Sequence, residues 1–310
     1  MKKRSAVFCV AMASAYLWSI AISEVALADD TAIVDPEVAD PEYPPSMVPV
    51  TSFEVQGDRA NGYWLYPNGP GPFPTVIFLH GFPGYEQNRD TAQALRRAGF
   101  VTFFFHYRGS WGSGGNFSLA GARQDVDAAI EYVKSSCGGK CKDAPVDSDR
   151  IALFGHSMGG WLGLMAAADR DDLSCVMALD FWDVGQSAVL LKESLAETGK
   201  HHPLWLAEEN LLSSKGAPLR TAASGVLLDE IVAMSDDAYP VNRAGDIAKA
   251  PVFLISTNDA SHADLLAALK EFDAPVRAEA WDTNHSFDNK RVALSSAASD
   301  WFTNSCGFDR

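Results

Sequence analysis

The sequence is short of basic side chains and of cysteine. Lys and Arg together number 25 against 40 Asp and Glu, which gives a formal net charge of −15. Nucleic acids and anionic membrane surfaces recruit proteins through basic patches, so we expect neither as a partner. The seven histidines and five cysteines have no spacing typical of a zinc site, and we expect no metal and no cofactor. No internal repeat is visible.

The chain is long and apolar enough to bury a large core. Its 310 residues are 47% hydrophobic, which favours one sizeable domain with insertions over two small ones.

Residues 1–28 have the features of a secretory signal peptide. Lys2-Lys3-Arg4 is a positive start, 6–22 is apolar, and Ala26-Leu27-Ala28 offers small residues for cleavage. An uncleaved membrane anchor is the alternative, because the apolar run is nearly long enough to span a bilayer. Ser14 and the Ala-x-Ala site favour cleavage. We therefore expect a periplasmic or secreted protein with no membrane contact after cleavage.

Four cysteines remain after Cys9 is removed with the signal. An even count in an exported chain suggests disulfides, and four cysteines allow three pairings. Cys137 and Cys141 flank a flexible Gly-Gly-Lys loop, so we expect them to bond locally and to leave Cys175 for Cys306.

A surface linker, 29–50, precedes a domain that runs from 51 to 310. Short apolar strands alternate with helices in this domain, which predicts an α/β fold with a mostly parallel, doubly wound sheet covered on both faces. The expected strands are 51–55, 62–66, 75–79, 101–105, 151–154, 175–179, 252–256 and 276–281. The expected helices are 90–98, 119–134, 161–168, 263–272 and 290–303.

An insertion, 185–245, interrupts this alternation with helical stretches at 188–198, 203–212 and 226–235. It follows the sixth strand, so we expect a cap over the carboxyl edge of the sheet, where ligands bind in such folds. The alternative is that the insertion lies on the surface and has no role in binding.

The pattern Gly155-His156-Ser157-Met158-Gly159 lies between an expected strand and an expected helix. A sharp turn at this point lifts the serine hydroxyl clear of the sheet, and small residues on both sides allow the backbone to double back. We therefore expect Ser157 to be a nucleophile.

A serine nucleophile needs a base, and the base needs an acid to orient it. Asp259 follows the strand 252–256, and His285 follows the strand 276–281. The order Ser157, Asp259, His285 is the one that accompanies this kind of turn. We therefore predict that these three residues form a catalytic triad.

Other residues compete for two of these positions. Asp180 and Asp183 follow the strand 175–179 and are alternative acids, and Asp259 is also placed to cap the helix that begins at 263. His262 is a weaker candidate for the base, because it lies at a helix start.

Two backbone amides are expected to bind the oxyanion. One belongs to Met158 at the start of the helix. The other belongs to Phe82 in the loop His80-Gly81-Phe82-Pro83-Gly84, which directly follows an apolar strand.

Together these motifs resemble the α/β-hydrolase superfamily. The resemblance covers about 74 to 302, without the cap. Within the superfamily, the stretches 107–114 and 125–133 look most like the prolyl-oligopeptidase and dienelactone-hydrolase branches. The sequence before the hydrolase-like region is too short for the β-propeller of the large prolyl oligopeptidases, which argues against the peptidase hypothesis. The His-Gly-x-Pro loop is also similar to that of epoxide hydrolases, but Ser157 stands where those enzymes have an aspartate.

The resemblance implies an exported serine hydrolase that cleaves a carboxylic ester. A small peptidase or amidase is the alternative, with a short peptide as substrate. A binding protein that kept the fold and lost the chemistry is a third possibility.

Overall fold

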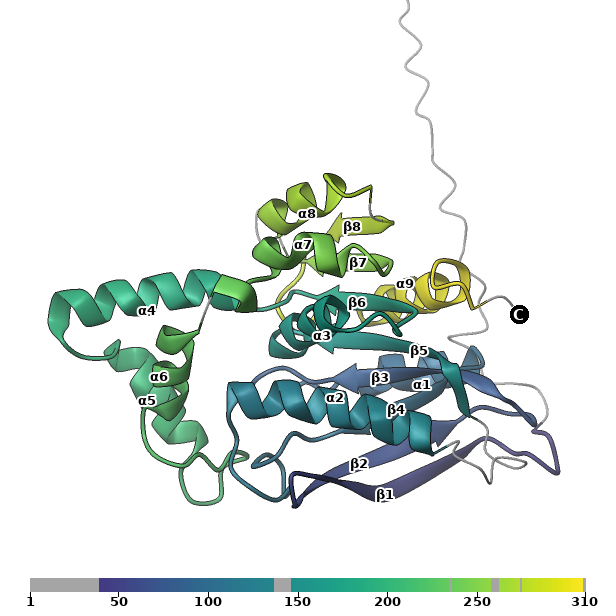
Figure 1. Ribbon diagram of the computed structural model, residues 1–310. Helices are drawn as coiled ribbons and strands as arrows, with labels where there is room; N and C mark the ends of the chain where they lie inside the picture. Colours follow the sequence, from purple (N-terminus) through teal and green to yellow (C-terminus); the bar gives the residue numbers. More distant parts are fainter. Residues whose placement is uncertain (1–38, 137–145, 235, 258–261, 274, 309–310) are drawn as a thin grey trace, which may run out of the picture.

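A single eight-stranded sheet organises the chain (Figure 1). The computed structural model describes residues 39–136, 146–234, 236–257, 262–273 and 275–308. The strand order is β1-β2-β4-β3-β5-β6-β7-β8; β1 and β2 pair antiparallel with each other, as do β2 and β4, and the remaining pairs are parallel. The strands are β1 (Ser46–Val55), β2 (Asp58–Tyr66), β3 (Phe73–Leu79), β4 (Val101–Phe105), β5 (Val146–His156), β6 (Cys175–Leu179), β7 (Val252–Ser256) and β8 (Val276–Ala280).

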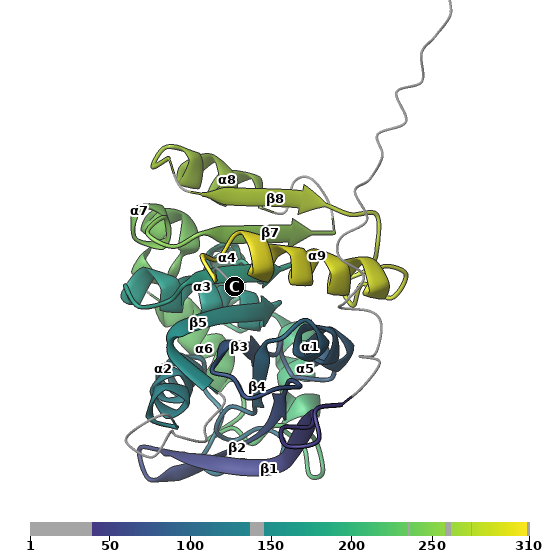
Figure 2. The ribbon, with the colours of Figure 1, turned by 90° about the vertical axis from the view of Figure 1, so that its right-hand side faces the viewer.

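Helices cover both faces of this sheet, and Figure 2 shows the two layers on opposite sides of the strands. One layer holds α1 and α9, and the other holds α2, α3, α7 and α8. The helices of these layers are α1 (Arg89–Arg97), α2 (Leu119–Ser135), α3 (Met158–Asp169), α7 (Ala244–Ile247), α8 (Ala263–Lys270) and α9 (Arg291–Asn304). The expected doubly wound α/β fold is confirmed.

Three short strands of the sheet are almost entirely apolar because helices cover both faces. Every residue of β4, β6 and β7 is buried. Where the sequence is continuously apolar, the predicted strand bounds agree with the observed ones, since all three strands begin and end where expected.

The first strand begins earlier than the sequence predicts. Ser46–Val55 is paired with β2, so the expected linker 29–50 overlaps a strand at its end. Pro49 argues against a strand when only the sequence is considered, because proline has no N–H group to donate to a neighbouring strand. The strand tolerates Pro49 because it lies at the sheet edge, and its register shifts between Val48 and Thr51.

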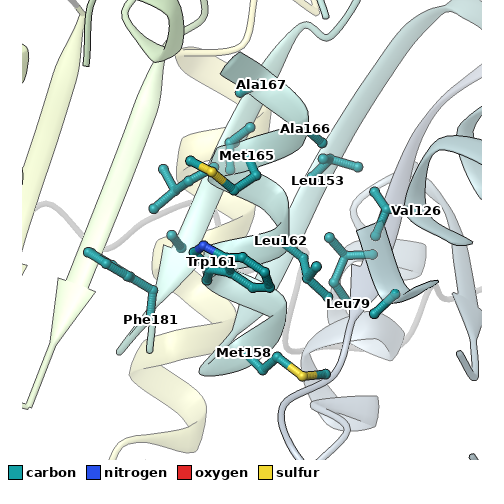
Figure 3. Packing of buried hydrophobic residues seen from close by; sticks show 14 of the residues in the cluster. Leu79, Val126, Leu153, Met158, Trp161, Leu162, Met165, Ala166, Ala167 and Phe181 are labelled. Atoms are coloured by element: carbon teal, nitrogen blue, oxygen red, sulfur yellow. The ribbon is translucent and has the colours of Figure 1, made fainter. Parts of the chain in front are cut away.

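Helix α3 is buried almost completely. Figure 3 shows its residues packed between neighbouring elements, with Trp161 beside Phe181 and Leu162 beside Leu79. Trp161 is fully buried and donates from Nε1 to the carbonyl of Ala238 at 2.9 Å. This packing fixes the amino end of α3, which carries the candidate nucleophile.

The insertion forms a set of helices at the carboxyl edge of the sheet (Figure 1). Glu230 joins it to the core, because its carboxylate accepts hydrogen bonds from the amides of Leu119 and Ala120 at the start of α2. The helices are α4 (Val184–Thr198), α5 (Pro203–Leu212) and α6 (Val226–Ala233), followed by 3-10 turns η2 (Asp236–Ala238) and η3 (Pro240–Arg243). Among all the described residues, no helix is long and apolar enough to cross a membrane.

Cys175 and Cys306 lie close enough to pair, with Cα atoms 5.2 Å apart, and the disulfide itself stays a prediction. The pair joins the start of β6 to the chain just after α9, 131 residues away. This is the long-range pairing that the sequence predicts. Cys137 and Cys141, the expected local pair, lie outside the described residues, as does the expected signal 1–28.

Candidate active site

Ser157 occupies a strained turn between β5 and α3. Its φ is 56° and its ψ is −119°, a conformation that non-glycine residues rarely adopt. The backbone is held there from both sides, since the Ser157 amide donates to Leu179 at 2.9 Å and its carbonyl accepts from Trp182 at 3.0 Å. The sheet thus supports a serine that projects from its carboxyl edge.

Two glycines make this turn possible. A Cβ on Gly155 would collide with the carbonyl of Gly159, and one on Gly159 would collide with the carbonyl of Leu79. Because these obstacles are backbone atoms, neither can move aside cheaply. The spacing of the sequence motif follows from this close approach of strand, turn and helix.

His285 pairs with Asp180, which directly follows β6. Nδ1 of His285 lies 2.5 Å from Oδ2 of Asp180, and the amide of Thr257 donates to Oδ1 at 3.1 Å. The His285 side chain is 57% exposed, whereas that of Asp180 is 12% exposed. Burial alone would raise the pKa of Asp180, but the hydrogen bonds from His285 and Thr257 outweigh it and lower the pKa below its usual value.

The expected acid, Asp259, lies outside the described residues, so its role stays a prediction. Because one ring nitrogen carries a single hydrogen, the contact with Asp180 already uses Nδ1 of His285. Among the described residues, the carboxylate that contacts His285 is therefore that of Asp180, the alternative candidate for the acid. Asp183, the other alternative, caps α4 by accepting from the amide of Gln186 at 2.9 Å.

His156 connects the turn to the loop that carries His285. Its Nε2 lies 2.8 Å from the carbonyl oxygen of His285, and its Nδ1 lies 3.3 Å from Nδ2 of Asn88. A carbonyl can only accept, so Nε2 carries the hydrogen. Burial, together with the charge of His285, lowers the pKa of His156 to about 3, which keeps it neutral. Nothing in the sequence identifies these two partners of His156.

The loop of the second oxyanion donor packs against the nucleophile. A Cβ built on Gly81 would lie 2.9 Å from Cβ of Ser157, so the loop needs glycine at this point. Phe82 and Ser157 line the same pocket. Met158 is the first residue of α3, where a backbone amide has no partner within the helix. The residues of both expected donors thus flank Ser157.

His262 does not take part in this cluster. Its ring stacks on that of Phe181 with centroids 4.0 Å apart, and the side chain is buried. Of these two candidate bases, His285 is the one in contact with Asp180.

A cavity of about 250 Å³ lies between Ser157 and the cap. The cap supplies most of its walls from α5 and α6, which supports the cap interpretation over a surface decoration. The lining residues are Phe82, Leu119, Ser157, Trp182, Trp205, Glu208, Glu209, Leu227, Leu228 and Ile231.

Comparison with known families gives a match over most of the chain. Residues 76–293 match the model described as the alpha/beta hydrolase family. An uncharacterised protein of Mycobacterium tuberculosis (strain H37Rv) is 31% identical over 192 residues, or 60% of this chain and 61% of that protein. The chain thus spans about three fifths of the length of this curated relative.

Solved structures show the same fold at low sequence identity. The Pyrococcus furiosus esterase Pf2001 superposes with a TM-score of 0.59 at 18% identity, covering 86% of this chain and 96% of the esterase. The Pyrococcus horikoshii acylaminoacyl peptidase superposes with a TM-score of 0.58 at 16% identity, covering 84% of this chain and 40% of the peptidase.

Proposed function

Because this chain belongs to the alpha/beta hydrolase family, we propose that it is a serine hydrolase that cleaves a small carboxylic ester through an acyl-enzyme. The observation that carries the proposal is the 2.5 Å contact between Asp180 and His285, on the loops beside the strained Ser157. A mostly buried carboxylate on Nδ1 fixes the tautomer that leaves Nε2 free to accept a proton.

The reaction proceeds in two halves. In the first, Oγ of Ser157 bonds to the substrate carbonyl carbon, and its proton passes to Nε2 of His285. The amides of Phe82 and Met158 hold the oxyanion of the tetrahedral intermediate. The ester C–O bond then breaks, and the leaving alcohol takes the proton from His285.

In the second half, water replaces the alcohol. Its oxygen bonds to the acyl carbon while His285 removes one proton, and the bond to Ser157 breaks as that proton returns to Oγ. The products are a carboxylic acid and an alcohol, with the enzyme restored. Asp180 stays ionised throughout and stabilises the imidazolium that forms twice.

The size and lining of the pocket support a small substrate. Its volume of about 250 Å³ lies at the low end of ligand cavities, and most of its lining is apolar. We propose that the enzyme acts in the periplasm or outside the cell, on the basis of the signal-like segment 1–28.

A fluorophosphonate probe tests the nucleophile directly. The purified protein should gain the mass of one probe on the peptide that contains Ser157, and 4-nitrophenyl butanoate should be hydrolysed. In Ser157→Ala the label should disappear and kcat should fall by a factor on the order of 10⁴ or more. A wild-type protein that neither labels nor turns over would instead indicate a binding protein of the same fold.

An amide series separates the esterase from the peptidase alternative. Aminoacyl 4-nitroanilides should turn over far more slowly than the matching 4-nitrophenyl esters, because the amine leaving group depends more strictly on protonation by His285. Equal or faster cleavage of the anilides would make the protein a peptidase.

A further inference from the structure

Glu209 is a buried carboxylate in the wall of the active-site pocket. It lies on α5, and only 3% of the residue is exposed to solvent. Neither carboxylate oxygen has a hydrogen-bond partner among the residues that the structure describes. Buried carboxylates are rare unless they are paired, so this side chain calls for an explanation.

The surroundings of Glu209 make its charge costly in the free protein. An unpaired carboxylate loses its hydration on burial without gaining a compensating contact. Glu209 also lies in the last turn of α5 (Pro203–Leu212), where the helix dipole places negative partial charge. Both effects oppose an anion at this site, and both would favour a cation that binds beside it.

The described residues that line the pocket offer no internal cation. Glu208 is the other charged side chain among them, and the lining contains no Lys or Arg. Trp182 and Trp205 also line the cavity, and aromatic rings add to the attraction of ammonium groups in desolvated sites. Among the described residues, no lining side chain can therefore pair with Glu209 as a cation, and the pocket has room for a small cation from solution.

We infer that Glu209 binds the ammonium group of the substrate, so that the enzyme prefers esters with a positively charged amine. This inference rests on the proposed function, because it places the substrate carbonyl at Ser157 and the ammonium at Glu209 within one cavity. The substrate class is a small amine-bearing carboxylic ester.

Matched pairs of 4-nitrophenyl esters test the preference. Each pair replaces an ammonium by a methyl group: glycyl against propanoyl, β-alanyl against butanoyl, and 6-aminohexanoyl against heptanoyl. At least one pair should show a kcat/KM ratio that favours the amine and that falls about 30-fold in Glu209→Gln. Comparing ratios between variants cancels the different intrinsic reactivities of the esters.

Glu197→Gln is the matched control, because it makes the same change on an exposed residue of α4 outside the pocket lining. Its ratios should equal those of the wild type. If Glu209→Gln lowers kcat/KM for both members of every pair equally, Glu209 is structural and the inference is wrong. The inference also fails if the wild type prefers no amine, whereas hydrolysis of the neutral esters would leave the proposed function standing.

A binding measurement separates the inference from catalysis. Hexylammonium chloride should raise the melting temperature of the wild type and of Ser157→Ala, since a ligand that binds only the folded state stabilises it. It should not protect Glu209→Gln, and the neutral 1-hexanol should not discriminate between the variants. If no ester were hydrolysed, protection that depends on Glu209 would still show that Glu209 binds ammonium groups, while the proposed function and the ester preference would both fail. Equal protection of all variants would overturn it.

Discussion

His156 holds the backbone of His285 in place, with its Nε2 2.8 Å from the His285 carbonyl oxygen. The residue before the proposed nucleophile thereby fixes the loop of the proposed base. Asn88 links His156 to Arg291. Its side-chain Nδ2 faces Nδ1 of His156, and its Oδ1 accepts a hydrogen bond from Arg291 at 3.1 Å. Arg291 also donates to the carbonyl of Ser286 at 3.0 Å, so the loop is anchored at two successive residues.

Replacing His156 should therefore slow catalysis without changing the chemistry. We expect His156→Leu to lower kcat by about 10- to 100-fold, because small displacements of a catalytic group have effects of this size. With 4-nitrophenyl butanoate as substrate, the Michaelis constant should change little, since His156 does not line the pocket. His156→Gln keeps a donor and should recover part of the rate. Equal losses in both variants, or a raised Michaelis constant with normal kcat, would exclude a positioning role.

The identity of the acid can be decided by two isosteric substitutions. Asp180→Asn should reduce kcat by about 10³- to 10⁴-fold, because an amide favours the wrong tautomer of His285. Asp259→Asn should reduce it little, since Asp180 already occupies Nδ1. Circular dichroism should show an unchanged fold in both. A large loss only in Asp259→Asn would restore the acid that the sequence order suggests.

The two aspartates explain where sequence reasoning stops. Asp180 follows β6 and Asp259 follows β7, and these strands are parallel neighbours in the sheet. The carboxyl ends of both strands lie at the same edge of the sheet, so the order of residues along the chain cannot tell which carboxylate faces the base. The 2.5 Å contact between Nδ1 of His285 and Oδ2 of Asp180 favours Asp180, and the two substitutions above test this choice.

Other parts of the site differ in how visible they are in the sequence. Ser157 is predictable because Gly155 and Gly159 are required by local backbone contacts. Glu209 is not, because nothing in the sequence distinguishes it from its exposed neighbour Glu208. Burial of one and exposure of the other depend on how the cap folds over the pocket. Locally determined features could be predicted, whereas those set by the cap or by contacts between the ends of neighbouring strands could not.

Three histidines that the fold shields from water should make the protein sensitive to mild acid. Burial lowers the pKa of His80 to about 4, that of His106 to about 3 and that of His156 to about 3. In the unfolded chain each titrates near a pKa of about 6.5. Between these values only the unfolded state binds the protons, so stability falls as pH decreases through this window.

In the middle of this window, each histidine should change the free energy of unfolding by about 1.4 kcal/mol per pH unit. The three together should change it by about 4 kcal/mol per pH unit. Urea unfolding at several pH values between about 7.5 and 5 measures it. His156→Gln should reduce the slope by about one third. A stability that is flat down to the lowest pH would mean that these histidines become protonated in the folded protein.

Glu230 should control how firmly the cap is attached. It accepts from Leu119 and Ala120, while Ser118 accepts from Gly121, so the first amides of α2 depend on both. Glu230→Ala should lower the free energy of unfolding by about 1 to 2 kcal/mol, as loss of a helix cap does. It should also raise KM, because Leu119 and the cap line the pocket together. The exposed Glu193→Ala on α4 is the control, and equal effects in both would argue against this attachment.

The pair Cys175–Cys306 should carry most of the stability that is lost on reduction. The pair closes a loop of 131 residues, for which the chain-entropy model gives about 5 kcal/mol in the oxidised protein. A bond between Cys137 and Cys141 would close a loop too short to matter comparably. It would also leave α9 unpinned, whereas a bond from Cys306 would tie the chain just after α9 to the start of β6. We therefore expect a Cys175→Ser/Cys306→Ser variant to melt as low as the reduced wild type, and Cys137→Ser/Cys141→Ser to melt near the oxidised one. Peptide mapping of the non-reduced, exported protein provides the check: free thiols at 175 and 306 would contradict both the bond and the proposed oxidising compartment.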